Sequence, residues 1–409
     1  MVFGRRVGFA RRLAIGLWRV RRIGQTDQMQ NVSADPLDLL RARTSAKWRI
    51  YPDDVLPLFV AEMDYPLAPA IAATLHDLIA RSDTGYVAGP GELAPAFAGF
   101  AERRWGWTVD PTRVRTTTDV SVGIVECLRM VIRPGDGVII TTPVYPPFFD
   151  LIPEAGGVVV DVALINDDAG WSLDLAAIES ALAGGARAVL LCNPHNPVGL
   201  VHSRASLIAL ADLAARYGAT VVSDEIHGPL THPDAEFVPF LDVSGAAREH
   251  GLCVTSPSKA FNLAGLKCAM MIAASDSMTA VLDGLPLEVG YRTALFGLHA
   301  STAAFRDGDD WLDGTIAAIV DSRRALTSLL AEHLPDIVYR EPSASFLAWL
   351  DFRAAGWGDD PSQRALAQAR VALNPGPTFG SQGIGFARLN FACSPEVLTE
   401  AVVRLAATR

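Results

Sequence analysis

Hydrophobic residues follow two different periods between residues 75 and 270. Short, nearly continuous apolar runs, typical of strands buried on both faces, lie at 114–117, 137–141, 158–162, 188–191, 219–223 and 252–255. Segments with helical spacing separate them, at 96–105, 122–132, 173–183 and 207–217. Glycine and proline lie between the periodic segments, as loops require. The alternation predicts an α/β fold with a mostly parallel sheet that is covered by helices on both faces.

The pattern changes after residue 310. A long helical period covers 311–334, and strand-like runs follow at 346–351 and 387–392. These runs predict a second, smaller α+β domain beside the sheet domain. We expect the large domain to span 75–310 and the small domain to combine 29–74 with 311–409.

The first 28 residues differ from the rest, because they contain seven arginines and no acidic residue before Asp27. Their apolar runs are too short for the hydrophobic region of a secretory signal. We interpret residues 1–28 as a disordered extension or as the result of a start codon assigned too early. A targeting or membrane-surface helix is the alternative.

The chain has 409 residues, half of them hydrophobic, and a formal net charge of −10. An acidic protein lacks the basic surface that nucleic acids and anionic membranes attract, so neither is an expected partner. The five cysteines are odd in number and form no CxxC pair, which favours a reduced, cytoplasmic protein. No apolar run is long enough for a transmembrane helix.

Polar residues follow several of the predicted strands directly. Residues 193–199 follow the strand at 188–191, and Asp224 follows the strand at 219–223. Ser256, Ser258 and Lys259 follow the strand at 252–255. Because ligands of open α/β sheets bind beyond the carboxyl ends of the strands, we expect these groups to share one site.

Lys259 is one of only three lysines, with Lys47 and Lys267. A lone lysine is usually a solvated surface charge, but one shielded at a sheet edge has a lowered pKa and acts as nucleophile and base. Pyridoxal phosphate (PLP) needs a lysine for a Schiff base and a carboxylate beside its ring nitrogen. Lys259 and Asp224 are the candidates, although a loop aspartate such as Asp224 commonly caps a helix instead.

A cofactor phosphate needs amide donors, which a helix N-terminus supplies. Residues 118–121 precede the predicted helix at 122–132 and include Val120 and Ser121. Asp119 or Ser121 could also be an ordinary helix cap, and both interpretations can hold together. Tyr145 follows the strand at 137–141 and could stack on the cofactor ring, or simply pack beside the neighbouring prolines.

The polar motifs occur in a recognisable order: NPHNPVG (193–199), SDEIH (223–227), SPSKAFNLAGLK (256–267) and ARLNFA (387–392). With LFVAEMDYPLAPAI (58–71), they resemble the fold-type I PLP enzymes of the class I/II aminotransferase superfamily. Within it they resemble the MalY/PatB branch, which consists of cystathionine β-lyases and cysteine-S-conjugate C–S lyases. The resemblance runs from Asp35 to the C-terminus and leaves out residues 1–28.

The resemblance implies a role for each residue of these motifs. Lys259 would hold the cofactor as a Schiff base, Asp224 would pair with the ring nitrogen, and Asn196 would donate to the ring hydroxyl. Arg388 would bind the α-carboxylate of an amino-acid substrate as a bidentate fork. The other residues that the resemblance assigns are Ala61 near that carboxylate, His227 near the ring hydroxyl, Tyr145 on the ring, and Val120, Ser121, Ser256 and Ser258 around the phosphate; Tyr145 and Asn196 would also contact the substrate.

Further positions bear on the phosphate and on assembly. Tyr86, in GYVAGPGEL, would reach the phosphate of the neighbouring subunit's cofactor, which implies a homodimer with shared active sites. Lys267 stands where many aminotransferases have an arginine on the phosphate, and it keeps the charge but loses the planar fork. No metal site is expected, because Pro229 and Pro233 disfavour a helix that presents His227 and His232 together.

The same residues allow more than one reaction. Lys259 would remove the α-proton of an amino acid. With a thiolate leaving group on Cβ, elimination gives a thiol, pyruvate and ammonia, and without one transamination follows. The resemblance favours a PLP-dependent C–S β-lyase for cystathionine, cysteine or S-substituted cysteine, with a class I/II aminotransferase or a PLP-binding regulatory protein as the alternatives.

Overall fold

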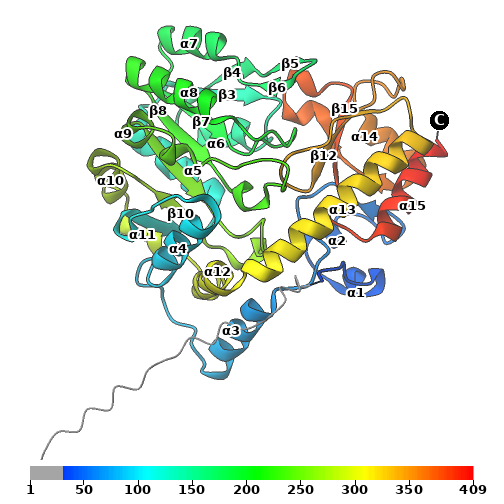
Figure 1. Ribbon diagram of the computed structural model, residues 1–409, viewed down its shortest axis with the longest axis horizontal. Coiled ribbons are helices and arrows are strands. Elements are labelled where there is room, and N and C mark those ends of the chain that lie inside the picture. The colour runs from blue at the N-terminus through cyan, green and yellow to red at the C-terminus, as the bar shows by residue number, and fades with distance from the viewer. Residues whose placement is uncertain (1–30, 409) are drawn as a thin grey trace, which may run out of the picture.

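A computed structural model describes residues 31–408 of the chain. Figure 1 shows a large body, built around a sheet, beside a smaller one that contains β12, β15 and α15. The interpretation of residues 1–28 lies outside the described residues. No helix within 31–408 is long and apolar enough to cross a membrane.

The large body contains a seven-stranded sheet in the order β2-β10-β9-β8-β7-β3-β4. Its neighbouring strands pair in parallel except at β10, which is antiparallel to both β2 and β9. The sheet confirms the predicted mostly parallel α/β architecture. The strands are β2 (Val114–Thr117), β3 (Gly137–Thr142), β4 (Val158–Ala163), β7 (Ala188–Cys192), β8 (Thr220–Asp224), β9 (Gly251–Thr255) and β10 (Ala269–Ile272).

Alternate residues of each strand pack into two separate hydrophobic cores, one on each face of the sheet. Helices close both cores, so both faces of the sheet are covered. Val138 and Leu190 share a core with α5, α6 and α10, whereas Ile139 and Leu191 pack on the side of α4, α7 and α8. The larger helices of this body are α3 (Pro69–Ala80), α4 (Leu93–Trp105), α5 (Val120–Val131), α6 (Phe148–Glu154), α7 (Leu175–Ala183), α8 (Arg204–Tyr217), α10 (Asp276–Asp283) and α12 (Leu295–Asp307). Shorter elements are α9 (Gly245–Glu249), α11 (Leu287–Tyr291), and the hairpin β5 (Ile165–Asp167) and β6 (Gly170–Ser172).

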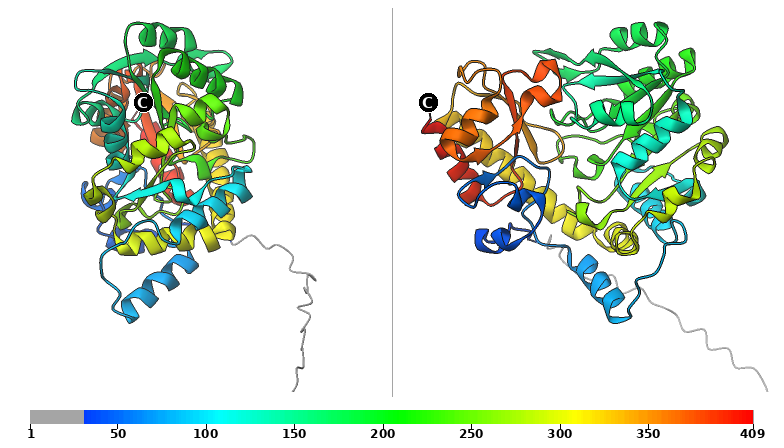
Figure 2. Two further views of the ribbon diagram at one scale, coloured as in Figure 1. Left: turned by 90° about the vertical axis from the view of Figure 1, so that its left-hand side faces the viewer. Right: turned by 180° about the vertical axis from the view of Figure 1, so that it is seen from behind.

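The smaller body is built on an antiparallel sheet in the order β11-β12-β15-β14. The N-terminal segment joins it, because β1 (Leu56–Pro57) pairs in parallel with β13 (Val371–Ala372), and Figure 2 shows the blue N-terminal helices beside the red C-terminal ones. The domain boundaries at 75 and 310 stay a prediction. The remaining elements are α1 (Leu37–Ala42), α2 (Ala46–Arg49), α13 (Asp309–His333), β11 (Val338–Tyr339), β12 (Leu347–Asp351), α14 (Pro361–Arg364), β14 (Asn374–Pro375), β15 (Phe386–Asn390) and α15 (Pro395–Ala406).

Two differences from the predicted elements concern the site. Helix α5 begins at Val120 rather than Val122, because the Asp119 side chain accepts the Val122 N–H and caps the helix there. Strand β10 was absent from the predicted elements. It lies inside the sheet with every residue buried, and a short apolar run of this kind cannot be separated from a helix segment by period alone.

Candidate active site

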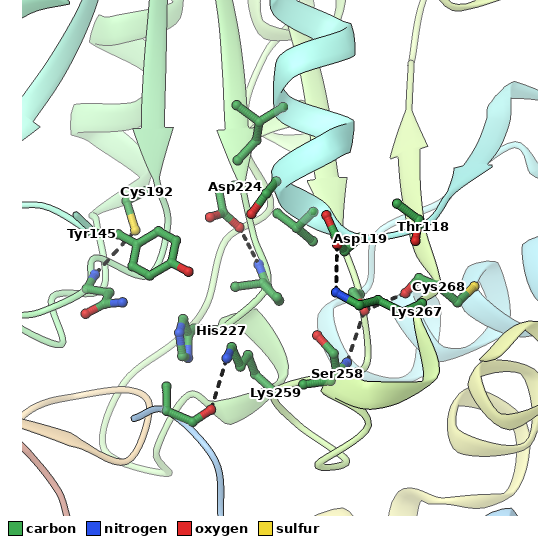
Figure 3. Close-up of a pocket in the computed structure, with 18 residues that line it drawn as sticks. Thr118, Asp119, Tyr145, Cys192, Asp224, His227, Ser258, Lys259, Lys267 and Cys268 are labelled. Carbon is green, nitrogen blue, oxygen red and sulfur yellow. Dashed lines mark hydrogen bonds and ion pairs between the residues drawn. The ribbon is translucent and has the colours of Figure 1, made fainter. Parts of the chain in front are cut away.

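The carboxyl ends of neighbouring parallel strands bring the predicted polar groups together. Cys192 at the end of β7 lies beside Asp224 at the end of β8, and Asp224 lies beside Val254 in β9. The loops after these strands border one pocket, shown in Figure 3. The pocket is lined by Ala61, Thr118, Asp119, Val120, Ser121, Ile124, Tyr145, Cys192, Asn196, Asp224, Ile226, His227, Ser256, Ser258, Lys259, Ala264, Lys267 and Cys268.

Lys259 reaches this pocket from the loop after β9. Its Nζ donates a hydrogen bond of 3.0 Å to the Ala61 carbonyl (Figure 3). Loss of water around the amine lowers the pKa of Lys259 to about 8, and the Arg388 guanidinium adds to this effect. Much of the amine is therefore neutral just above physiological pH, as a nucleophile and base requires.

Asp224 is buried at the opposite side of the pocket. One carboxylate oxygen accepts the Ile226 N–H at 3.2 Å, and within residues 31–408 the carboxylate forms no ion pair. Burial raises the pKa of Asp224 to about 7, and this is opposed by the Ile226 hydrogen bond and by the charge of Lys259. A cationic ligand placed against this carboxylate would stabilise its ionised form.

Asn196 and Arg388 form a buried pair beside the pocket. Arg388 Nη1 donates to Asn196 Oδ1 at 3.0 Å, so the amide nitrogen of Asn196 remains a donor for another group. Arg388 does not line the pocket itself, yet its Nε has no hydrogen-bond partner within residues 31–408. Burial lowers the pKa of Arg388 to about 10, which leaves the guanidinium charged at neutral pH.

The N-terminus of α5 forms one end of the pocket. Val120 and Ser121 begin the helix, and Asp119 caps it through the Val122 N–H at 3.0 Å. The other Asp119 oxygen accepts from Lys267 Nζ at 3.0 Å (Figure 3). The cap therefore brings a negative charge to the helix end, and Lys267 offsets it, so that an anion can still approach.

The two serines of the Lys259 loop, Ser256 and Ser258, have different roles. The Ser256 hydroxyl donates to the Cys268 carbonyl at 2.7 Å and accepts the Ser258 N–H at 3.1 Å. Its single proton is thus used within the protein, and Ser256 mainly shapes the loop. The hydroxyls of Ser258 and Ser121 have no side-chain hydrogen bond within residues 31–408 and are the better phosphate donors.

His227 and Tyr145 complete the walls near Lys259 and Asp224. Burial lowers the pKa of His227 to about 3, and the charges of Lys259 and Arg388 act in the same direction. The neutral imidazole has no partner for Nδ1 within residues 31–408. Burial also raises the pKa of Tyr145, with a further contribution from Asp224, so its hydroxyl stays protonated. Both side chains present neutral polar groups to a ligand.

Arg388 lies beside the pocket, bonded to Asn196, whereas Tyr86 is the predicted site residue that lies away from it. Its side chain is 93% exposed and does not line the pocket. The pair His227 and His232 is also separated, because His232 accepts a hydrogen bond from Arg323 rather than facing the pocket. No group of residues suited to a metal ion occurs within 31–408.

The motifs in the sequence do not identify several residues that line the pocket. Cys192, Ile226, Ala264 and Cys268 line the pocket through apolar or weakly polar atoms, and nothing in their residue type distinguishes them from ordinary core residues. The only available signal was their place in the chain: Cys192 and Cys268 adjoin Asn193 and Lys267, Ile226 lies two residues after Asp224, and Ala264 lies within the 256–267 motif.

The described residues fit PLP at each of its polar groups. Asp224, buried without an ion-pair partner, suits a protonated ring nitrogen, and the free amide donor of Asn196 suits a ring hydroxyl. The Lys259 amine, with its lowered pKa, suits the aldehyde. The start of α5, with Ser121, Ser258 and Lys267, suits the phosphate.

Comparison with known proteins agrees with this arrangement. Residues 53–405 match the family Aminotransferase class I and II. The cystathionine beta-lyase of Corynebacterium glutamicum is 36% identical, over 90% of this chain and 98% of its own length. Cystathionine beta-lyase PatB of Bacillus subtilis (strain 168) is 33% identical, over 87% of this chain and 92% of its own length.

A solved structure of a PLP-containing enzyme has the same fold. The crystal structure of cystalysin from Treponema denticola, which contains a pyridoxal 5'-phosphate cofactor, superposes with a TM-score of 0.84 at 27% identity, covering 90% of this chain and 96% of that chain. The chain therefore belongs to the class I and II aminotransferase family, in its PLP-dependent cystathionine β-lyase (MalY/PatB) branch.

Proposed function

We propose that this protein is a PLP-dependent C–S β-lyase that cleaves cystathionine, cysteine or an S-substituted cysteine to a thiol, pyruvate and ammonia. The observation that carries the proposal is the Lys259 amine. Its pKa is lowered to about 8, and it opens on a pocket that also contains the buried Asp224 carboxylate. The relatives named as cystathionine β-lyases favour elimination over transamination.

The chain's own residues account for binding and proton transfer. Arg388, held by Asn196 and the Phe59 carbonyl, would bind the substrate α-carboxylate with its remaining donors. When bound, PLP supplies an electron sink for the charge left on Cα. Lys259 would remove the Cα proton as the Cβ–S bond breaks with its electron pair going to sulfur. The thiolate would take up a proton to leave as the thiol, and water would convert the remaining carbon fragment to pyruvate and ammonia. Asp224 would hold the ring nitrogen of the cofactor, and a protonated nitrogen there would keep the carboxylate ionised.

The other residues of the pocket hold the two ligands in place. We propose that His227 and Tyr145 contact the cofactor ring and that Val120, Ser121, Ser258 and Lys267 bind its phosphate, with Ser256 shaping that loop. The substrate contacts would come from Arg388, Ala61, Tyr145 and Asn196.

The assignment of Lys259 is tested by chemical trapping. Borohydride treatment of the loaded protein should fix the cofactor mass onto the peptide that contains Lys259, and Lys259→Ala should lose both the trapped mass and the activity. Lys267→Arg is the matched control, because the exposed Lys267 side chain keeps its charge as arginine and should leave trapping at saturating PLP unchanged. An adduct that persists in Lys259→Ala would show the assignment to be wrong.

The reaction class is tested by two assays on one preparation. Release of pyruvate from cystathionine without any added keto acid supports the lyase. Amino transfer that depends on a keto acid, without pyruvate release, would show an aminotransferase instead. If the protein binds PLP but shows neither activity, a PLP-binding regulatory protein is the remaining interpretation.

We further propose that the protein is a cytoplasmic homodimer. Tyr86, Leu287 and Tyr291 are 93%, 77% and 58% exposed in the single chain, and Leu287 and Tyr291 border an apolar hollow together with the residues that follow Tyr86. A second copy of the chain would cover these side chains and bring Tyr86 to a neighbouring cofactor phosphate. The five free, buried cysteines support a reducing compartment.

A further inference from the structure

A short segment crosses the site between the two bodies of the molecule. We call residues 59–63 the strap. It is attached to the small body on both sides, through Asn390 N–H to the Leu58 carbonyl at 2.8 Å and Asp64 N–H to the Ala392 carbonyl at 3.0 Å. Within it, the Glu62 N–H bonds to the Val60 carbonyl at 2.9 Å, so Ala61 lies at the centre of a tight turn.

A side chain holds each carbonyl of the strap. Arg388 donates to the Phe59 carbonyl at 3.0 Å, and Lys259 donates to the Ala61 carbonyl at 3.0 Å. Asn390 donates to the carbonyls of Val60 and Glu62, at 2.8 Å and 2.7 Å. The strap therefore sets the positions of the two residues that would handle the substrate, Arg388 and Lys259.

Asn262 binds the end of the strap in a two-point contact. Its Nδ2 donates to the Met63 carbonyl at 2.9 Å, and its Oδ1 accepts the Met63 N–H at 3.1 Å. The amide side chain thus pairs with both backbone groups of one residue, as a neighbouring strand would. Such a contact specifies one register, because a shift by one residue would break both bonds.

Asn262 and Lys259 are the residues of the 256–267 loop whose side chains bond to the strap. The bond from Lys259 is temporary if the proposed function holds, because its amine must leave the Ala61 carbonyl to bond to the cofactor. Only the Asn262 contact then ties the strap to this loop within the described residues.

We propose that Asn262 is a positioning residue, which keeps the strap in register with Lys259 and Arg388 whether or not Lys259 holds the cofactor. The inference rests on the role proposed for Lys259. It concerns a residue that would touch neither substrate nor cofactor and acts only through the backbone of the strap.

The substitution Asn262→Gly tests this proposal without straining the chain. Asn262 has a φ of 58°, a left-handed conformation that glycine adopts freely. The variant removes both amide contacts and keeps the loop backbone. Ser82→Gly is the matched control, because Ser82 has a φ of 55° and makes no side-chain hydrogen bond to the strap.

The first measurement uses the cofactor-free protein. The rate at which an acylating reagent modifies Lys259, followed by peptide mass spectrometry across pH, reports the pKa of its amine. The Ala61 carbonyl stabilises the protonated amine, so in Asn262→Gly the pKa of Lys259 should fall further, by about one unit. The charged groups that act on the amine, Arg388, Glu62, Asp224 and Lys267, are the same in both proteins.

The second measurement uses the loaded enzyme. In Asn262→Gly, kcat/KM should fall about tenfold while the melting temperature stays close to that of Ser82→Gly. A lower melting temperature with an unchanged Lys259 pKa would show that Asn262 is purely structural and would overturn the proposal. The proposal would also fail if neither the pKa of Lys259 nor kcat/KM changed in Asn262→Gly. Absence of pyruvate release from the wild-type enzyme would refute the proposed function instead, and the cofactor-free measurement would still decide the role of Asn262.

Discussion

Burial sets the proton affinity of individual residues in this site. Loss of water raises the pKa of Asp224 to about 7 and lowers that of Lys259 to about 8. The neighbouring Glu225 shows the same effect, with its pKa raised to about 7 by burial, although four donors surround it: the Phe240 N–H, Ser223, Cys253 and Asn193. Within residues 31–408, Asp224 has one such donor, the Ile226 N–H, so its carboxylate is the one suited to bind a cationic ligand.

The pKa of Asp224 predicts how pH affects the stability of the cofactor-free protein. An aspartate with a normal pKa of 3.8 when unfolded and about 7 when folded binds more protons in the folded state between those values. Its contribution to stability is therefore fully present below pH 3.8 and is lost as the pH rises from there through about 7. The amide of Asp224→Asn does not titrate, so this variant should gain stability relative to wild type between about pH 5 and pH 8, by a few kcal/mol at about 1.4 kcal/mol per pKa unit.

Thermal melting of both cofactor-free proteins at the two pH values measures this difference. The same substitution in the loaded enzyme should lower activity by about 10²–10³-fold, because a neutral amide cannot stabilise a protonated ring nitrogen. A melting-temperature difference that does not change with pH would refute the assigned ionisation of Asp224.

At the scale of one element, three groups together set the charge at the N-terminus of α5. The unpaired N–H groups of its first turn attract anions, the Asp119 cap repels them, and Lys267 balances the cap at 3.0 Å. The Lys267 side chain is 54% exposed, so its effect on the fold is small and its effect on a phosphate is the larger one.

Lys267→Met should therefore weaken PLP binding about tenfold, the equivalent of one charge-assisted hydrogen bond. Lys267→Arg keeps the charge and should remain within about threefold of wild type. Titration of the cofactor-free proteins with PLP, followed by visible absorbance, measures both constants. Equal affinity in Lys267→Met and wild type would remove Lys267 from the phosphate site.

At the scale of the whole molecule, the exposed apolar surface around α11 predicts self-association. Leu287→Glu places a charge at this surface, and the first turn of a helix accepts an acidic residue well. Sedimentation should therefore show monomers for this variant and dimers for wild type, with reduced PLP affinity in the monomer because Tyr86 no longer reaches a partner.

Val403→Glu is the matched control, since Val403 is 42% exposed on α15, in the small body. It should leave the dimer intact. Dimers of undiminished stability in Leu287→Glu would place the interface on another face.

The sequence predicted those parts of the site that follow from strand order. Parallel strands with helices between them end at one sheet edge, so Asp224 and Lys259 could be placed together from apolar runs and the residues after them. The sequence did not predict strand β10, because its short buried run has no distinctive period. Helix α5 begins at Val120 and not at the predicted residue 122, because capping by Asp119 depends on the side-chain geometry of one residue.

The sequence by itself determined the α/β architecture and the chemical groups at the sheet edge, since both depend on local periodicity and on residues close to strand ends. Only the tertiary structure decided how these groups are held. Asn262 meets Met63 across 199 positions, and Arg388 meets Asn196 across 192. Contacts between such distant segments leave no periodic signal in the chain, because they arise when the small body folds against the sheet.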